Sequence, residues 1–194
     1  MAMHKLVAFL LFSCLLFGYS CSGPAEPLPP DPNAHRDGPD GTVDPPAYVI
    51  RQSRFYGLAP GQPLAEAGDK LTQRGEHYLI HGDDSDTIGY LVASALDSSV
   101  IGDIHVLTPR AATEGDIRVG DPFSRLLIAY PKLGVQGSPA ADGVYAYSSN
   151  KAFRLGEYTD DREAVPQGEV PAATPVTEII IRPGVRPVSA PPGF

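Results

Sequence analysis

The pattern of apolar and polar positions between residues 48 and 182 predicts helices and strands in a regular order. A Gly-x-Pro-apolar motif occurs twice, beginning at Gly61 and at Gly120. Proline suits the first turn of a helix, where its missing N–H costs no hydrogen bond. After each motif, residues on one face recur at the spacing of a helix. In the first segment they are Leu64, Ala67, Gly68 and Leu71, and in the second they are Phe123, Leu126, Leu127 and Tyr130. We therefore expect two helices, one stopped at Gly75 and the other within Pro131–Gly134.

Strand patterns follow each predicted helix. Runs rich in β-branched and aromatic residues, separated by short turns of Gly, Asp, Ser and Asn, are typical of antiparallel strands. The predicted strands are Glu76–His81, Thr87–Leu96 and Val100–Leu107 after the first helix, and Val144–Ser148, Ala152–Glu157 and Val176–Arg182 after the second, with Tyr48–Phe55 and Ile117–Val119 as lead-in strands. Because the motif repeats with an offset of 59 residues and the element order repeats with it, the sequence predicts a duplication. The expected fold is α+β, with two tandem helix-plus-three-antiparallel-strand repeats forming a mainly antiparallel sheet packed on two helices.

The first twenty residues have the pattern of a secretory signal. Lys5 precedes an apolar run that extends from Leu6 to Phe17. This run is too short for a membrane-spanning helix, which needs about 20 apolar residues. Small residues, Gly18 and Ser20, follow it at the positions that a signal peptidase recognises. We expect residues 1–20 to be a signal peptide that is removed on export.

The segment Gly18–Cys21 resembles a bacterial lipobox. The resemblance implies that the Cys21 thiol carries diacylglycerol, that fatty acyl chains such as palmitate anchor the protein, and that Cys21 becomes residue one. The −3 and −2 residues, Gly18 and Tyr19, depart from the usual pattern. Leu11–Cys14 fits that pattern better letter by letter, but processing there would leave an apolar region of only about five residues. Processing at this second segment and ordinary cleavage with a free thiol are the alternatives.

The cysteine count supports acylation of Cys21. The chain has two cysteines, and removal of residues 1–20 leaves Cys21 as the only thiol. An unpaired cysteine in an exported chain needs an explanation, and acylation supplies one. Each buried CH₂ of a lipid contributes about 0.8 kcal/mol to membrane affinity, so several acyl chains hold a protein firmly. Ser22 after the cysteine favours the outer membrane under the enterobacterial sorting pattern, with the domain facing the periplasm.

Proline-rich segments flank the predicted domain. Residues 21–47 comprise the lipidated cysteine and a linker with eight prolines, which buries too little apolar surface to offset its ordering entropy. Residues 183–194 are expected to be a disordered proline-rich tail, which leaves 48–182 as one domain. Asp31–Gly38 in the linker is rich in Asp and Asn but lacks the spacing of an EF-hand, so we expect no calcium site there.

The charge balance narrows the range of partners. The formal net charge is −8, and it becomes −9 when Lys5 is removed with the signal. No basic cluster is present, which argues against nucleic acid and against attachment to anionic lipid surfaces. The acidity is explained by solubility alone, or by a positively charged protein partner.

One stretch of the domain resembles a known family. Ile101–Pro109, followed by Gly115–Ser124, is similar to the central signature of an uncharacterised family of enterobacterial envelope-stress (sigma-E regulated) lipoproteins. In that family a strand and a short linker lead to a Gly-x-Pro-Phe-Ser helix start in the same order. The long proline-rich linker of this chain is a departure. Because the family has no established activity, the resemblance implies a location and a fold and brings no catalytic residues.

The sequence contains no strong catalytic or metal-binding pattern. His77 and His81 have the spacing that binds a metal from a helix, but their surroundings predict a strand, on which the two rings lie about 13 Å apart. There is no Gly-x-Ser-x-Gly motif. We therefore expect no metal, no cofactor and no enzymatic activity. A deep pocket joining His77 or His105 to a carboxylate would change that expectation.

Two acidic loops are the candidate partner-binding sites. Asp83, Asp84 and Asp86 crowd a predicted hairpin tip, and Asp160 and Asp161 lie in a long connector, residues 158–175. Exposed turns favour Asp for local reasons as well, so a solvated tip is the plain interpretation. Tyr145 and Tyr147 alternate along a predicted strand and should share one face of the sheet, which belongs either to the core or to a ligand surface.

These observations predict a non-catalytic envelope lipoprotein. It would be a binding or structural module, tethered to the outer membrane and facing the periplasm, that contacts another envelope protein or a cell-wall component. The alternative is a periplasmic inhibitor or immunity lipoprotein directed against a basic cell-wall hydrolase, with the acidic loops as its contact surface.

Overall fold

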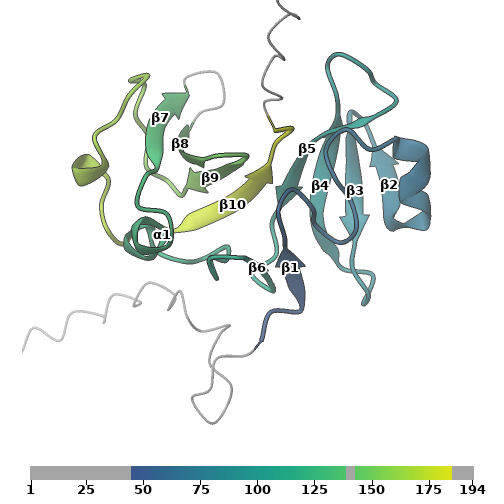
Figure 1. Cartoon of the computed structure of the whole chain (residues 1–194), viewed down its shortest axis with the longest axis horizontal. Helices are drawn as coiled ribbons and strands as arrows, with labels where there is room; N and C mark the ends of the chain where they lie inside the picture. Colours follow the sequence, from purple (N-terminus) through teal and green to yellow (C-terminus); the bar gives the residue numbers. More distant parts are fainter. Residues whose placement is uncertain (1–44, 139–142, 185–194) are drawn as a thin grey trace, which may run out of the picture. The chain divides into compact units, whose positions relative to one another are not determined.

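The computed structural model describes residues 45–138 and 143–184 (Figure 1). The predicted signal peptide, Cys21, the Asp31–Gly38 motif and most of the predicted linker and tail lie outside the described residues. Within the two described ranges, no helix is long and apolar enough to cross a membrane.

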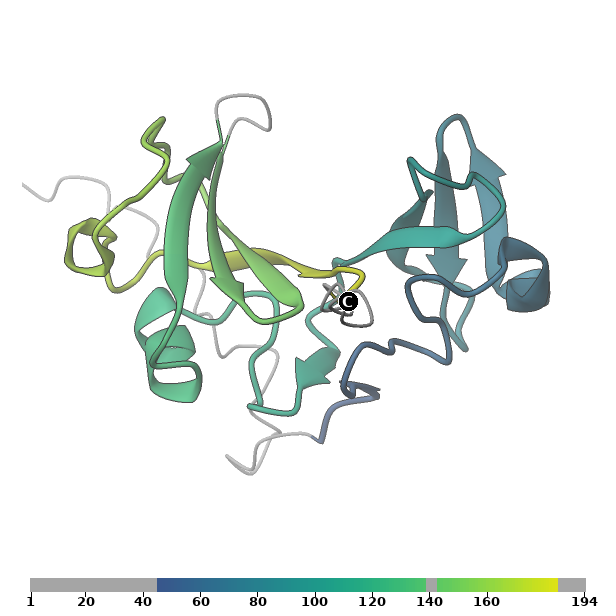
Figure 2. The same ribbon diagram turned by 45° about the horizontal axis from the view of Figure 1, so that its top comes forward.

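Eight strands form one antiparallel sheet with the order β2-β3-β4-β5-β10-β9-β8-β7. Their bounds are β2 (Leu71–Arg74), β3 (His77–His81), β4 (Thr87–Ala93), β5 (Ile101–Val106), β7 (Gly134–Ser138), β8 (Gly143–Ser148), β9 (Lys151–Leu155) and β10 (Val176–Ile181). At the centre of the sheet β5 pairs with β10, although these strands are far apart in sequence (Figures 1 and 2). Two short strands, β1 (Tyr48–Ile50) and β6 (Ala111–Thr113), pair in parallel in a separate two-stranded sheet.

Within residues 45–138 and 143–184, the helices are short segments. They are η1 (Leu64–Lys70) and η3 (Gln167–Glu169), both 3₁₀, and the α-helix α1 (Phe123–Ala129). The segment η1 is interrupted at Gly68, whose φ is 64°. Strands therefore predominate over helices among the described residues.

The predicted fold class is wrong. The sequence pattern predicted two tandem repeats, each with a helix and three antiparallel strands, forming a sheet packed on two helices. The structure is instead a mostly-strand domain built on one sheet of eight strands, with one short α-helix and two 3₁₀ segments among the described residues. The prediction failed at two segments that form strands, of which one was assigned in part to a helix and the other was not predicted as a strand.

The first of these segments follows Gly68. This glycine was counted on the apolar face of the predicted helix, but its positive φ ends the regular path, since left-handed backbone costs glycine little. Leu71 was also placed in that helix, whereas it begins β2. Gly75 was interpreted as a helix stop, yet with a φ of 65° it opens the two-residue turn between β2 and β3.

The second segment is Gly134–Ser138, where the sequence pattern predicted no strand and only a helix stop within Pro131–Gly134. It forms β7 and pairs with β8 from Gly134↔Tyr147 to Ser138↔Gly143. Its two glycines and single apolar residue, Val135, give a weak strand pattern. The segment is therefore a strand because it pairs with β8. Of the predicted lead-in strands, Tyr48–Phe55 is reduced to β1, and Ile117–Val119 is irregular, while β6 lies just before it.

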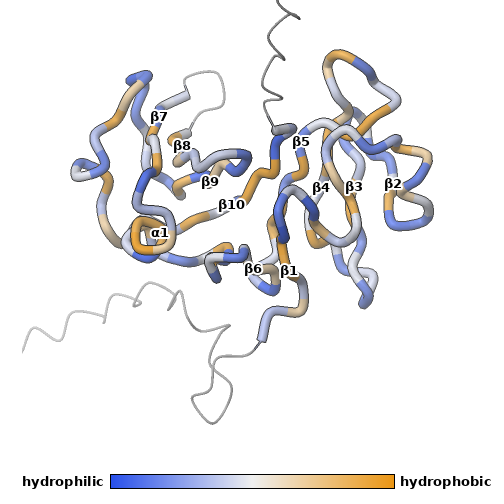
Figure 3. Tube along the Cα trace, in the orientation of Figure 1, coloured by the Kyte–Doolittle hydropathy of each residue, from blue (hydrophilic) through white to orange (hydrophobic). Residues whose placement is uncertain are grey.

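The other six predicted strands are confirmed, with ends that differ by at most three residues. Alternating burial explains this success: β5, for example, buries Ile104 and Val106 and leaves His105 half-buried on the other face. The inner face belongs to one hydrophobic core that includes Phe55, Phe123 and Phe153, all fully buried. Apolar positions are concentrated along β10 and on α1 (Figure 3).

Candidate functional site

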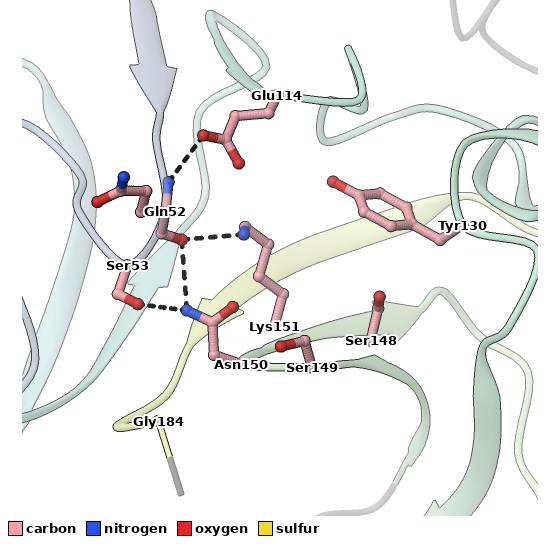
Figure 4. A pocket seen from close by; sticks show the side chains of 9 residues that line it. All are labelled: Gln52, Ser53, Glu114, Tyr130, Ser148, Ser149, Asn150, Lys151 and Gly184. Carbon is pink, nitrogen blue, oxygen red and sulfur yellow. Dashed lines mark hydrogen bonds between the residues drawn. The ribbon is translucent and has the colours of Figure 1, made fainter. Parts of the chain in front are cut away.

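An open polar pocket of about 460 Å³ is formed where five loop segments meet (Figure 4). It lies beside the turn after β1, the residue after β6, the end of α1, the β8–β9 turn and the residues after β10. The lining residues are Gln52, Ser53, Glu114, Tyr130, Ser148, Ser149, Asn150, Lys151 and Gly184. Amide, hydroxyl, carboxylate and ammonium groups therefore dominate the lining.

The β8–β9 hairpin brings Lys151 into this pocket. Ser148 pairs with Lys151 across a two-residue loop, Ser149–Asn150, in which Ser149 has a φ of 54°. Lys151 is the first residue of β9 and is only 7% exposed. A lysine is seldom buried to this extent without a charged partner.

Within the described residues, the Lys151 ammonium uses only part of its hydrogen-bonding capacity. Its Nζ donates a hydrogen bond of 2.9 Å to the backbone carbonyl oxygen of Gln52. An ammonium has three donors. In the described part of the chain, no carboxylate lies within 4.0 Å of Nζ, and no second acceptor is hydrogen-bonded to it. The remaining donors are available to a molecule in the pocket.

Gln52 lies between two charged groups of opposite sign (Figure 4). Its backbone N–H donates to Glu114 Oε1 at 3.0 Å, while its carbonyl oxygen accepts from Lys151 and, at 3.3 Å, from the side-chain amide of Asn150. The same amide donates to Ser53 Oγ at 2.5 Å. Gln52 has a φ of 52°, a left-handed conformation that is uncommon outside glycine, and these bonds hold it there.

The hydroxyl groups of the pocket are separate from its two charged groups among the described residues. Nucleophilic catalysis needs a hydroxyl or thiol hydrogen-bonded to a base. Among the described residues, the hydroxyls of Ser148, Ser149 and Tyr130 form no hydrogen bond with Lys151 or Glu114. The pocket instead presents one cation, one anion and several neutral polar groups at fixed positions.

A second polar cluster lies on the outer face of the sheet, across β4, β5 and β10. His105 Nδ1 and Glu178 Oε1 are 2.8 Å apart, and the Tyr90 hydroxyl donates to the same oxygen at 3.1 Å. The Tyr90 and His105 rings are stacked, with centroids 4.3 Å apart. These contacts join three neighbouring strands on the face opposite the core.

The cluster shifts the pKa of two of its members. Burial alone would raise the pKa of Glu178, but the hydrogen bond and charge interaction with His105, together with the Tyr90 hydroxyl, outweigh that effect and lower it. Burial and the neighbouring Glu178 carboxylate raise the pKa of Tyr90 well above its usual value. Glu178 therefore acts as a buried anion that organises the centre of this face.

The two histidines with metal-like spacing lie on a strand, as predicted. His77 packs edge-on against the Tyr90 ring at 5.0 Å, and His81 Nε2 lies 3.1 Å from Thr72 Oγ1. His77, Arg74, Leu79 and Tyr90 line a shallow pocket of about 210 Å³. Among residues 45–138 and 143–184, no group of three or more His, Cys, Asp or Glu side chains is placed to hold a metal.

The first acidic loop is engaged with its own chain. Asp83 accepts a hydrogen bond of 2.6 Å from the Tyr56 hydroxyl, which raises the pKa of Tyr56 to about 12. Arg110 forms ion pairs with Asp84 at 3.0 Å and with Asp86 at 4.0 Å. All three carboxylates keep solvent contact, but their charge is partly compensated locally.

The second acidic segment behaves in the same way. Arg162 forms ion pairs with Asp160 and Glu169, both at 2.6 Å. The hydrogen bonds from Arg162 lower the pKa of Asp160 to about 2. Asp161 is exposed. Neither acidic segment contributes a residue to the Lys151 pocket.

Tyr145 and Tyr147 share one face of β8, as predicted, with ring centroids 6.3 Å apart. They lie opposite Arg154 and Ala152 of β9, and the Arg182 guanidinium sits over the Tyr147 ring at 5.6 Å. Both tyrosines are half-buried, whereas the intervening Ala146 is fully buried. The tyrosine face is therefore the outer face of the sheet rather than the core.

Sequence reasoning missed the pocket residues. Gln52, Glu114 and Lys151 belong to no motif, and their contacts join positions 62 and 99 residues apart. The only local signal was the tight Ser149-Asn150-Lys151 turn, which predicted a hairpin but said nothing about what the lysine contacts.

Comparison with solved structures finds a protein of similar fold, whereas the two comparisons with sequences find no match. No protein-family model matches the chain. No curated protein matches it. Its structure is similar to the crystal structure of the uncharacterized protein yfeY from Escherichia coli, with a TM-score of 0.47 and 15% sequence identity, over 70% of this chain and 99% of that one.

Proposed function

We propose that this protein is a lipid-anchored, non-catalytic binding module of the bacterial cell envelope, and that its ligand site is the Lys151 pocket. The observation that supports this most directly is the buried Lys151 ammonium, which faces an open pocket with donors that the described residues leave unused. Burying a charge is costly unless it is paired, and an anionic group in the pocket would supply the missing partner.

The proposed location rests on the N-terminal sequence. A signal-peptide pattern leads directly to Cys21, and the following proline-rich linker would let the domain bind at a distance from the membrane. The Ile101–Pro109 and Gly115–Ser124 signature supports membership of the uncharacterised family of sigma-E regulated envelope lipoproteins. We place the anchor in the outer membrane, with the domain facing the periplasm.

Local pairing of the acidic loops favours a binding module over a hydrolase inhibitor. An inhibitor of a basic enzyme would present uncompensated carboxylates. Asp84, Asp86 and Asp160 instead pair with Arg110 and Arg162 of the same chain.

A titration with small anions tests the ligand site. Acetate and inorganic phosphate are added separately to the ¹⁵N-labelled protein, and amide chemical shifts are followed at constant ionic strength. We expect saturable shifts centred on Ser148–Lys151 and Gln52 for at least one anion. Lys151→Met should abolish them, while Lys132→Met, which removes an exposed lysine, should leave them unchanged. If no anion produces saturable shifts in the pocket, the proposed ligand site is wrong.

The anchor is tested separately. Mass spectrometry of the mature protein from native membranes should show an N-terminal acylated Cys21, and Cys21→Ser should release the protein from the membrane fraction. An unmodified N-terminus, or acylation at Cys14, would contradict the proposal.

A further inference from the structure

We propose that the Lys151 pocket recognises an α-amino-carboxylate group, that is, a free ammonium and a free carboxylate carried on one carbon atom. This inference rests on the proposed function and names the ligand class of the same site. It follows from the way in which Glu114 and Lys151 already hold the backbone of Gln52.

The Gln52 backbone serves as an internal template for such a ligand. Its N–H, on one side of the α carbon, donates to Glu114, and its carbonyl oxygen, on the other side, accepts from Lys151. The two charged groups are therefore spaced to serve a donor and an acceptor that flank a single carbon. An α-amino acid has the same order of groups, with an ammonium donor and a carboxylate acceptor on either side of its α carbon.

The signs of the two charges also match such a ligand. Glu114 would accept from the ligand ammonium, and Lys151 would donate to its carboxylate. Both interactions would be charge-assisted hydrogen bonds, which are stronger than the neutral contacts that water can offer in their place. A simple carboxylic acid would engage only Lys151, and a simple amine would engage only Glu114.

Both charged groups have capacity left for a ligand. A carboxylate has about four lone-pair sites and an ammonium has three donors. Among the described residues, Gln52 occupies one lone-pair site of Glu114 and one donor of Lys151. The exposed Glu114 and the open pocket allow a ligand to approach, and the hydroxyls of Ser148, Ser149 and Tyr130 supply further polar contacts around it (Figure 4).

Two sources carry this chemistry in a cell envelope. One is a free amino acid. The other is the zwitterionic end of a diamino acid residue, such as meso-diaminopimelate, within a cell-wall peptide. An open pocket of about 460 Å³ is large enough to admit either, because ligand pockets commonly measure about 300–1,000 Å³.

Calorimetric titration of the purified protein separates the contributions of the two charges. The probes are L-alanine, D-alanine, acetate and ethylamine at one ionic strength, followed by a cell-wall tripeptide that ends in meso-diaminopimelate. Either alanine enantiomer should bind at least about tenfold tighter than acetate, because one additional charge-assisted hydrogen bond contributes about 1.5–3 kcal/mol. Ethylamine should bind more weakly than alanine.

Substitutions at Glu114 and Lys151 distinguish this inference from the proposed function. Glu114→Gln keeps an acceptor for the Gln52 N–H, so the pocket should persist while alanine affinity falls to that of acetate. Lys151→Met should abolish binding of both alanine and acetate. Lys151→Arg should retain part of the affinity for each. Unchanged affinities in Lys132→Met, together with native thermal unfolding of each variant, show that any loss is specific to the pocket.

The outcomes are separable. If acetate binds as tightly as alanine and Glu114→Gln changes neither, the α-amino-carboxylate inference is wrong and the anion site stands. If none of the probes binds, both proposals fail. Tighter binding of the tripeptide than of free alanine identifies the cell-wall source, and the reverse identifies a free amino acid; either result requires the same pocket.

Discussion

The Nζ atom of Lys151 and the carbonyl oxygen of Gln52 are joined by a 2.9 Å hydrogen bond, although the residues are 99 positions apart in the chain. This contact ties the β8–β9 turn to the segment after β1. It also holds a buried cation at the wall of the pocket, so one side chain contributes to both the fold and the proposed ligand site.

We expect this hydrogen bond to contribute little to the stability of the fold. Lys151→Met preserves the aliphatic stem. It removes one hydrogen bond, which contributes about 1 kcal/mol, and it also removes the desolvation cost of the buried ammonium, so the free energy of unfolding should change by no more than about 1 kcal/mol. Asn150 still donates to the Gln52 carbonyl in this variant. Urea unfolding compared with Lys132→Met gives the value, and a loss large enough to unfold the protein at 25 °C would contradict this interpretation.

Glu178 should contribute more to stability than an exposed carboxylate does. It is buried and is joined to His105 at 2.8 Å and to the Tyr90 hydroxyl at 3.1 Å. Glu178→Gln keeps the size of the side chain but removes the charge, and we expect a loss of about 1–3 kcal/mol at pH 7. Glu157→Gln, at an exposed position, is the control and should be close to neutral.

The Glu178 contribution should depend on pH in one direction. Because its folded-state pKa is lowered, the ionised carboxylate stabilises the fold above its unfolded pKa of about 4.3, and this stabilisation is lost as the pH falls through the folded value. The stability difference between the wild type and Glu178→Gln should therefore be complete at pH 7 and shrink below about pH 4. Unfolding curves at pH 7, 5, 4 and 3 measure it, and a difference that grows with acidity would show that the sign is wrong.

Gly137 in β7 should not tolerate a side chain. A Cβ at this position would overlap the backbone oxygen of Asp160, and Gly137 N–H already donates to the Arg162 carbonyl at 2.8 Å. Gly137→Ala must displace this backbone and should cost at least about 1–3 kcal/mol. Gly134→Ala lies in the same strand with no atom within 4 Å of the new Cβ, and its melting temperature should stay close to that of the wild type.

Local periodicity accounts for the parts of the fold that were predicted correctly. Alternation along β8 placed Tyr145 and Tyr147 on one face, and the strand pattern around His77 and His81 separated their rings. These features depend on a repeat of two residues along one strand, so they can be read from that strand alone. The Leu71–Arg74 and Gly134–Ser138 strands have no such pattern, and their pairing partners make them strands.

The amino-acid sequence by itself determined the acidic charge and the strands with strong alternation, and it predicts export and acylation at Cys21. Tertiary structure alone decided the strand order of the sheet, the surroundings of Glu178 and the meeting of Gln52, Glu114 and Lys151. The physical reason is the separation along the chain of the residues that interact. Periodicity and turn chemistry act over a few neighbouring residues, whereas a buried charge finds its partners only after distant segments have packed around it.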